Sequence, residues 1–274
     1  MYIHLKNRAL LKISGSDSES FLQAQLSNDI NKLDQKSIQF NAYCQHQGKI
    51  IALFWLMRFE NGFLLSFPID LLETVMSRLQ MFVIMSDVII EDVTSNFIQA
   101  GLINEIDNKG YLISEKMSLS VQSKKNHIEV NIDNQDEWIK ACIESGIPEV
   151  FSSTSEKLVP QMLNLDIDEF GVNFSKGCYP GQEVVARLHY LGDAKRRLFA
   201  FTSDSEMQIG DNLYCASSKA AKARGERYKG SGMIVSKVKY NSLFYCLGTM
   251  DIDLLSDKIT LNNEHGPQLT LIKK

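Results

Sequence analysis

Apolar and polar residues in the first third of the chain follow the two periods that distinguish strands from helices. Alternation over residues 9–13 predicts a strand that ends at Gly15. Ser16 and Glu19 have the spacing of a capping box, so we expect a helix to begin there. The inward-facing residues of that helix are expected to be Phe21, Leu22 and Leu26.

The pattern continues with strands joined by tight turns. Alternation over residues 38–44 predicts a strand with one buried face, and the apolar run 50–57 predicts a largely buried strand. Asn61-Gly62 is a hairpin signal that leads into a strand over 63–67. The elements expected next are a helix over 71–79 and a strand over 88–90. This order predicts an α+β fold of mostly antiparallel sheet.

The middle of the chain is less regular. Short strands are expected at 97–102, 111–113 and 128–132. Asp133 or Asn134 can cap a helix that is closed by Gly146. The inward residues of that helix are expected to be Trp138, Ile139 and Cys142. Residues 147–175 are expected to form loops, with one helical segment at 158–165.

After Gly192 the pattern changes to short strands separated by turn residues. Strands are expected at 198–202, 212–215, 233–240, 243–248 and 269–272. This spacing is typical of a small β-barrel or sandwich of roughly 80 residues. We therefore predict two domains, one over 1–192 and a C-terminal β-barrel domain over 193–274.

Composition places the chain among ordinary globular proteins. It has 274 residues, 44% of them hydrophobic and 23% charged. A net charge of −4 gives no bulk electrostatic reason to bind nucleic acid or an anionic membrane. No apolar run approaches the roughly 18 residues of a membrane-spanning helix. The first residues lack the apolar region of a signal peptide, so we expect a cytoplasmic protein.

The cysteines do not form a recognisable metal or disulfide motif. Five are scattered along the chain without any Cys-x-x-Cys pair, and an odd count argues against a disulfide framework. We expect no metal site, although a cluster bridged between two chains through Cys178 stays open. Cys44 and His46 fit a strand end followed by a turn, and Asp166, Asp168 and Glu169 fit a solvated turn.

One stretch, Lys176 to Glu183, concentrates chemically useful residues. Pro180 suits the first turn of a helix, and the apolar residues of that helix would be Val184, Val185 and Leu188. Cys178 would then lie just before a helix N-terminus and two residues after Lys176, and both features favour a thiolate. The alternative is that Cys178 is a small buried apolar residue.

The stretch resembles the Lys-x-Cys-Tyr-x-Gly-Gln-Glu signature of the YgfZ family, which comprises folate-binding proteins related to the glycine-cleavage T-protein. Residues 15–30, 41–49 and 160–165 resemble further segments of that family, with Ala24 in place of a glycine. The resemblance implies two interleaved α/β subdomains plus a C-terminal β-barrel around a central folate-sized cavity. It extends from about residue 10 to 192 and is only architectural in the barrel.

The resemblance also implies a function. The protein would bind tetrahydrofolate or a one-carbon derivative and support assembly or repair of iron–sulfur enzymes, including those that methylthiolate tRNA. Cys178 would act as a thiolate activated by Lys176. The residues expected to shape and position its loop are Gly177, Tyr179, Gly181, Gln182, Glu183 and Arg187. The residues expected to contact folate are Asn28, Asn41, Lys49, Arg224 and Arg227.

One departure separates the chain from the T-protein. The strand that carries an acidic residue in that enzyme corresponds here to residues 48–53, in which Ala52 and Leu53 cannot act as acid or base. We therefore expect an accessory folate-dependent factor rather than a classical aminomethyltransferase. Two alternatives stay open: a folate-dependent one-carbon transferase, and a ligand-free interaction protein. The expected partners are iron–sulfur enzymes or assembly proteins, with no direct contact to nucleic acid or membrane.

The residues around 195–197 and 219–229 are rich in lysine and arginine. A charged linker and a solvated barrel loop explain them without any ligand. The functional interpretation is that the loop clamps the glutamate tail of folate or an acidic partner, because arginine forks match carboxylates.

Overall fold

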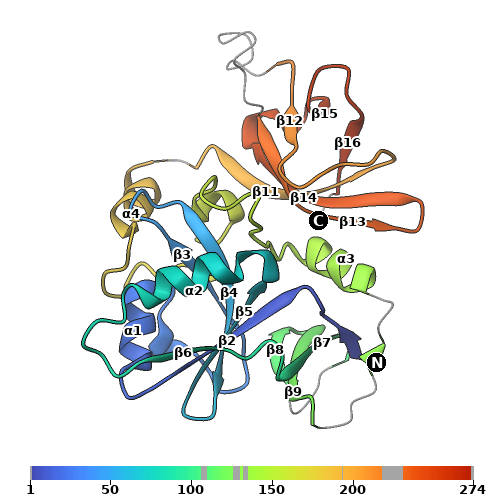
Figure 1. Ribbon diagram of the computed structural model, residues 1–274. Coiled ribbons are helices and arrows are strands. Elements are labelled where there is room, and N and C mark those ends of the chain that lie inside the picture. Colours follow the sequence, from blue (N-terminus) through green and yellow to red (C-terminus); the bar gives the residue numbers. More distant parts are fainter. Residues whose placement is uncertain are drawn as a thin grey trace.

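The computed structural model describes residues 2–105, 110–125, 130–131, 135–192, 194–217 and 231–272. They form two five-stranded sheets and a closed six-stranded barrel, with a few short helices between them (Figure 1). This α+β architecture confirms the predicted fold class. No helix among the described residues is long and apolar enough to cross a membrane.

The first sheet has the strand order β3-β4-β5-β2-β6 and is antiparallel throughout. Its strands are β2 (Arg8–Ser14), β3 (Gln39–Cys44), β4 (Ile50–Phe59), β5 (Gly62–Pro68) and β6 (Ile89–Asp92). The predicted hairpin at Asn61-Gly62 is confirmed, since β4 and β5 pair from Phe59 and Gly62 onward.

Both faces of this sheet are buried, so the prediction of one buried face for the strand over 38–44 is wrong. Asn41 and Tyr43 are as inaccessible as the alternating apolar positions of β3. One face packs against the helices α1 (Ser18–Gln25) and α2 (Leu72–Gln80). The other face, which includes Phe40 and Trp55, packs against the second sheet and α3 (Gln135–Ser145).

The second sheet has the strand order β10-β1-β7-β9-β8. Its strands are β1 (Tyr2–His4), β7 (Phe97–Ile103), β8 (Tyr111–Ser114), β9 (Met117–Ser123) and β10 (Val130–Asn131). The first strand of the chain thus pairs with strands that follow about a hundred residues later, in agreement with interleaved subdomains. The predicted cap at Asp133 or Asn134 lies outside the described residues.

The capping-box prediction for the first helix is wrong. The residue at the N-cap position of α1 is Asp17, and its side chain makes no capping hydrogen bond. Glu19 instead accepts from the guanidinium of Arg58 at 3.0 and 3.2 Å. Arg58 on β4 therefore binds the Glu19 carboxylate, which in a capping box would accept from the backbone at the start of the helix.

The segment predicted to be helical at 158–165 is only a short 3₁₀ turn. The chain has five such turns among its described residues: Ile30–Lys32, Ile69–Leu71, Pro160–Leu163, Ile167–Glu169 and Ile252–Leu254. Asn164 ends the third of these in a left-handed conformation and bonds Leu198 through its side chain.

The barrel closes in the order β11-β14-β13-β12-β15-β16 around its own apolar core. Its strands are β11 (Arg196–Ser203), β12 (Asn212–Tyr214), β13 (Gly232–Tyr240), β14 (Leu243–Asp251), β15 (Ile259–Leu261) and β16 (Gln268–Leu271). Helix α3 lies against β13, which places the barrel over one end of the two sheets (Figure 1). The barrel begins close to residue 193, but the division into two independent domains stays a prediction.

Candidate functional site

The signature stretch forms an exposed loop followed by helix α4 (Gln182–Leu191). Gly181 occupies the N-cap position, so Pro180 precedes the helix and does not lie in its first turn as expected. Glu183 is in the first turn and Gly192 ends the helix, as expected. Val185 is buried, whereas Val184 is 42% exposed.

A close approach of two glycines fixes where the loop lies. Gly181 has φ +81°, and a Cβ there would stand 2.4 Å from the carbonyl oxygen of Gln45 and 2.7 Å from the Cα of Gly48. Only glycine allows this conformation and this contact. The same reason does not apply to Gly177, where a Cβ would meet nothing within 4 Å. The loop is thus docked on the turn between β3 and β4.

Lys176 anchors the loop to the end of α1 and the turn that follows it. Its ammonium donates to the carbonyl oxygens of Gln23, Leu26 and Asn28 at 2.7, 2.5 and 2.9 Å. A lysine ammonium has three N–H donors, and all three are used here. Burial lowers the pKa of Lys176 to about 8. No N–H remains for a hydrogen bond to Cys178, so any effect of Lys176 on that thiol is electrostatic or positional.

Cys178 is exposed, which excludes the alternative of a small buried apolar residue. The other four cysteines, all among the described residues, are buried. Burial raises the pKa of Cys44 and Cys246 to about 12 and raises the pKa of Cys142 further. Cys178 is therefore the thiol that a partner or reagent can reach.

The remaining signature residues lie on both sides of Cys178. Tyr179 points inward and is buried, with its ring 5.5 Å from the ammonium of Lys176. Burial raises the pKa of the Tyr179 phenol. Glu183 and Arg187 are exposed on α4. Neither accepts one of the three hydrogen bonds that Lys176 donates, all of which go to backbone carbonyl oxygens of residues 23–28. Pro180 and His46 line a shallow pocket beside the loop.

The turn expected to be solvated is exposed at Asp168 and Glu169, but not at Asp166. Its carboxylate side chain is only 5% exposed and accepts two hydrogen bonds from Arg197, at 2.5 and 3.1 Å. Arg197 also donates to the carbonyl oxygen of Gln161 at 3.0 Å. The predicted charged linker at 195–197 thus fastens the start of the barrel to the segment before the signature.

Two of the residues expected to contact folate have structural partners. The side-chain oxygen of Asn41 accepts from the backbone N–H of Asn28 at 3.0 Å, and Asn28 donates to the carbonyl oxygen of Phe40. Asn28 also lines an open cavity of about 270 Å³ with Gln39 and Glu169. Lys49 is half-buried in the turn after β3. Arg224 and Arg227 lie outside the described residues.

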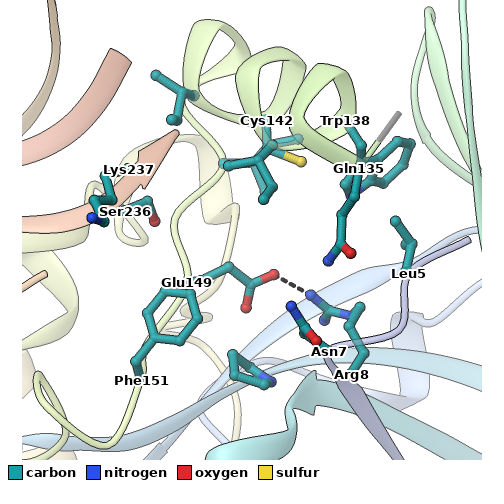
Figure 2. A pocket seen from close by; sticks show the side chains of 14 residues that line it. Leu5, Asn7, Arg8, Gln135, Trp138, Cys142, Glu149, Phe151, Ser236 and Lys237 are labelled. Atoms are coloured by element: carbon teal, nitrogen blue, oxygen red, sulfur yellow. Dashed lines mark hydrogen bonds and ion pairs between the residues drawn. The ribbon is translucent and has the colours of Figure 1, made fainter. Parts of the chain in front are cut away.

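A different cavity lies between the first sheet, α3 and the barrel (Figure 2). Its volume is about 110 Å³. The residues that supply its polar and aromatic lining are Asn7, Arg8, Gln135, Trp138, Glu149, Phe151, Ser236 and Lys237. No residue of the signature contributes to this lining, so the structure does not bring Cys178 to the rim of this cavity as expected.

Arg8 and Glu149 form an ion pair in this cavity, through Arg8 Nη1 and Glu149 Oε1. Arg8 also donates to the hydroxyl and carbonyl oxygens of Ser66 at 2.7 and 3.1 Å. Its guanidinium lies 3.9 Å from the ring centroid of Trp55. Burial raises the pKa of Glu149, and the positive charge of Arg8 opposes that rise.

Comparison with known proteins identifies the family. No protein-family model matches the chain. It is 30% identical to an uncharacterised protein of Haemophilus influenzae, over 94% of this chain and 91% of that protein. It is 26% identical to the tRNA-modifying protein YgfZ of Colwellia psychrerythraea, over 85% of this chain and 80% of that protein. The chain belongs to the YgfZ family.

A solved structure supports the fold expected of a YgfZ-family protein. The chain superposes on the glycine cleavage system aminomethyltransferase T of Bartonella henselae with a TM-score of 0.66. The superposition covers all of this chain and 84% of that one, at 9% sequence identity. The predicted T-protein-like architecture is therefore confirmed, and at this identity the likeness concerns the fold alone.

The strand singled out from the sequence is β4 of the first sheet. Ala52 and Leu53 lie within β4 and are completely buried. No acid or base is available at either position. The described residues also contain no group of three histidine, cysteine or acidic side chains that could hold a metal ion.

Sequence reasoning missed Arg8 and Glu149. Each is an isolated charged residue without a motif around it, and they are separated by 141 positions. The available signal was the position of Arg8, directly before the alternating apolar residues of β2. A charged residue is rarely buried without a partner, so a buried Arg8 would have implied a partner elsewhere in the chain.

Proposed function

We propose that this YgfZ-family protein binds a reduced folate and supports the assembly or repair of iron–sulfur enzymes, including those that methylthiolate tRNA. Kinship with a relative named tRNA-modifying protein supports the connection to tRNA. The observation that carries the proposal is Cys178, the exposed thiol of an otherwise buried set, held on a loop that matches the family signature.

In this proposal the cavity shown in Figure 2 takes the ring of tetrahydrofolate or a one-carbon derivative rather than the whole molecule. Its volume of about 110 Å³ exceeds the 10–15 Å³ that one ordered water needs, but is below the roughly 300 Å³ of small ligand pockets. Trp138 and Phe151 offer apolar walls, and buried polar atoms of Glu149 and Ser236 have no hydrogen-bond partner among the described residues. The glutamate tail would extend out of the cavity, and Arg224 and Arg227 are our candidates to hold it.

Tetrahydrofolate, when bound, supplies a carrier for one-carbon groups. The chain's own contribution at the signature is a thiol presented to a cluster, a sulfur species or a protein partner. Lys176 holds that loop through hydrogen bonds to backbone carbonyl oxygens, and Gly181 lets the loop lie against the β3–β4 turn. The absence of a carboxylate at Ala52 and Leu53 favours an accessory factor over an aminomethyltransferase.

Anaerobic calorimetric titration with tetrahydrofolate tests the first half of the proposal. We expect saturable one-to-one binding with a Kd near micromolar, or about −8 kcal/mol. Trp138 in the cavity wall provides a fluorescence check. No binding up to millimolar folate, with cellular activity intact, would make the protein a ligand-free interaction factor. Turnover of a methylated amine with tetrahydrofolate would make it a one-carbon transferase.

Complementation of a host that lacks the protein tests the second half. We expect Cys178→Ala to fail to restore methylthiolated tRNA, measured by mass spectrometry of tRNA digests. Ser175→Ala is the matched control, because Ser175 is an exposed residue of the same loop. Full methylthiolation with Cys178→Ala would end the proposed thiolate role.

A further inference from the structure

The β7 hollow, an open cavity around the start of β7, has a volume of about 390 Å³. This volume lies within the roughly 300–1,000 Å³ of small-molecule sites. The residues that line it come from within 4–8 and 92–99, together with Ile69, Leu72 and Lys124. Of these, Leu5 and Arg8 also line the cavity of Figure 2, whereas the others do not. The hollow is therefore a distinct candidate site.

A histidine and two lysines meet at this hollow because β7 lies between β1 and β9. On one side His4 of β1 is opposite Ala100 of β7, and Lys6 lies in the turn that follows β1. On the other side Lys124 directly follows β9, and its N–H donates to the carbonyl oxygen of Asn96 at 3.0 Å. Strands on either side of a third strand are about 10 Å apart, so the two long lysine side chains can reach one ligand group.

These three side chains experience one positive field. Burial lowers the pKa of His4, and the charges of Lys6 and Lys124 lower it further. Neither lysine forms an ion pair with a carboxylate in the described part of the chain, in contrast to the Lys12–Glu60 pair on β2. An anion placed among them would reduce their mutual repulsion.

The other charges at the hollow do not cancel this field. Arg8 already has a partner in Glu149. Asp92 is the one carboxylate among the described lining residues, and its Oδ1 accepts from the backbone N–H of Thr94 at 2.9 Å. Two lysine charges therefore face one carboxylate, and the hollow has an excess of positive charge.

Apolar side chains form the rest of the hollow. Phe97 is half-buried, and its ring meets that of Phe59 edge to face at 5.5 Å, which fixes its position. Ile69 is 43% exposed beside it in the lining. The hydroxyl oxygen of Thr94 accepts from the N–H of Leu10 at 2.9 Å, so its own O–H is left for a ligand. An anion with an apolar body suits these walls.

We propose that the β7 hollow binds a small organic phosphate, with the phosphate among His4, Lys6 and Lys124 and the apolar body against Phe97 and Ile69. A phosphate monoester carries a charge of about −1.5 to −2 at pH 7 and has three acceptor oxygens, one for each of the three side chains. A carboxylate has one charge and two oxygens, so it matches this cluster less well. The site is independent of the proposed folate function.

The first test is calorimetric titration of the full-length protein with phenyl phosphate, which joins one phosphate to one ring. We expect saturable binding with a Kd of about 1 mM or lower. Benzoate, with the same ring and a single charge, should bind about fivefold or more weakly, and uncharged phenol should not saturate. Absence of saturation by phenyl phosphate, or equal affinity for benzoate, would overturn the proposal.

The second test uses variants of exposed residues, which should leave the fold intact. Lys6→Gln and Lys124→Gln should each weaken phenyl phosphate binding about 10-fold, as expected for one lost charged hydrogen bond. Asp92→Asn should strengthen it about twofold or more, because a like charge is removed. Lys116→Gln is the matched control: Lys116 is exposed directly before β9, at the opposite end from Lys124. Its affinity should stay within about twofold of wild type.

The direction of these effects decides the assignment. An equal loss in the three lysine variants would show attraction by net charge alone, and weaker binding by Asp92→Asn would contradict the field described above. Tetrahydrofolate titration of Lys124→Gln separates the two sites. An affinity equal to that of wild type, or no folate binding by either protein, leaves the phosphate site in place. Weaker tetrahydrofolate binding by Lys124→Gln would assign the hollow to folate and overturn the proposal.

Discussion

Removal of the Lys176 ammonium tests whether this residue anchors the signature loop. Lys176→Met keeps most of the apolar stem and deletes three charged hydrogen bonds, worth about 1.5–3 kcal/mol each. Burial of the charge offsets part of this, because a pKa lowered from 10.5 to about 8 corresponds to a penalty of about 3 kcal/mol on the charged form. We expect a net loss of about 2–5 kcal/mol in the free energy of unfolding.

Urea denaturation followed by circular dichroism measures this loss, with Lys32→Met as the control. Lys32 is a neighbouring lysine whose side chain is 56% exposed and whose ion pair with Glu169 is on the surface. Its replacement should cost less than about 1 kcal/mol. An equal effect of the two substitutions, or no effect of Lys176→Met, would refute the anchor and return Lys176 to the role of thiol activator.

The pH dependence gives a second, independent sign. The folded-state pKa of Lys176 lies below its ordinary value, so the unfolded chain binds more protons between pH 8 and 10.5. Wild type should therefore gain stability from this residue as pH rises through that window, by up to about 1.4 kcal/mol per pH unit. Lys176→Met lacks this gain, so the stability difference should widen from pH 7.5 to 9.5. A constant or shrinking difference would contradict the burial argument.

Three further outcomes are expected. Native protein should react with about one equivalent of iodoacetamide, detected by mass spectrometry, and Cys178→Ser with none, because only this thiol is exposed; labelling of several cysteines would contradict this. Asp166→Asn should destabilise the protein by about 2–4 kcal/mol in thermal unfolding, since it leaves Arg197 without its charged partner; a neutral result would assign the pair no structural weight. Cys44 and Cys246 should contribute a loss of stability as the pH rises above 9, because the folded state holds the thiol protons that the unfolded state releases. Cys44→Ala should reduce that pH slope in urea titrations, and an unchanged slope would exclude this cause.

The elements that could be predicted are those specified by local pattern. The hairpin at Asn61-Gly62, helix α2 and most barrel strands follow from periodicity and turn residues. Strand β9 also alternates, at Met117, Leu119 and Val121, and could have been found by the same rule. The depth of burial could not be predicted, because the second face of the first sheet is covered by segments far away in the chain.

The candidate site divides in the same way. The contiguous motif predicted the loop of Cys178 and the helix that follows it, since a short sequence specifies a local structure, although α4 begins after Pro180 rather than at it. The partners of Lys176, of Asp166 and of Glu149 could not be predicted, because each contact depends on how distant segments pack. A lysine two residues before a cysteine suggested an activator of the thiol. In the structure the ammonium of Lys176 is bound to three backbone carbonyl oxygens, so the lysine anchors the loop.

The anchoring of the signature loop by Lys176 has a consequence for synthesis of the chain. The three carbonyl oxygens that it binds belong to residues 23–28, which leave the ribosome about 150 residues before their partner. Contacts of such sequence separation close a long loop, whose entropic cost slows folding. The turn after α1 therefore stays without this partner through most of translation, and a chain truncated before Lys176 leaves it uncompleted. The signature loop therefore assembles late in synthesis, and its assembly also completes the hydrogen bonding of residues 23–28, which are among the first to be synthesised.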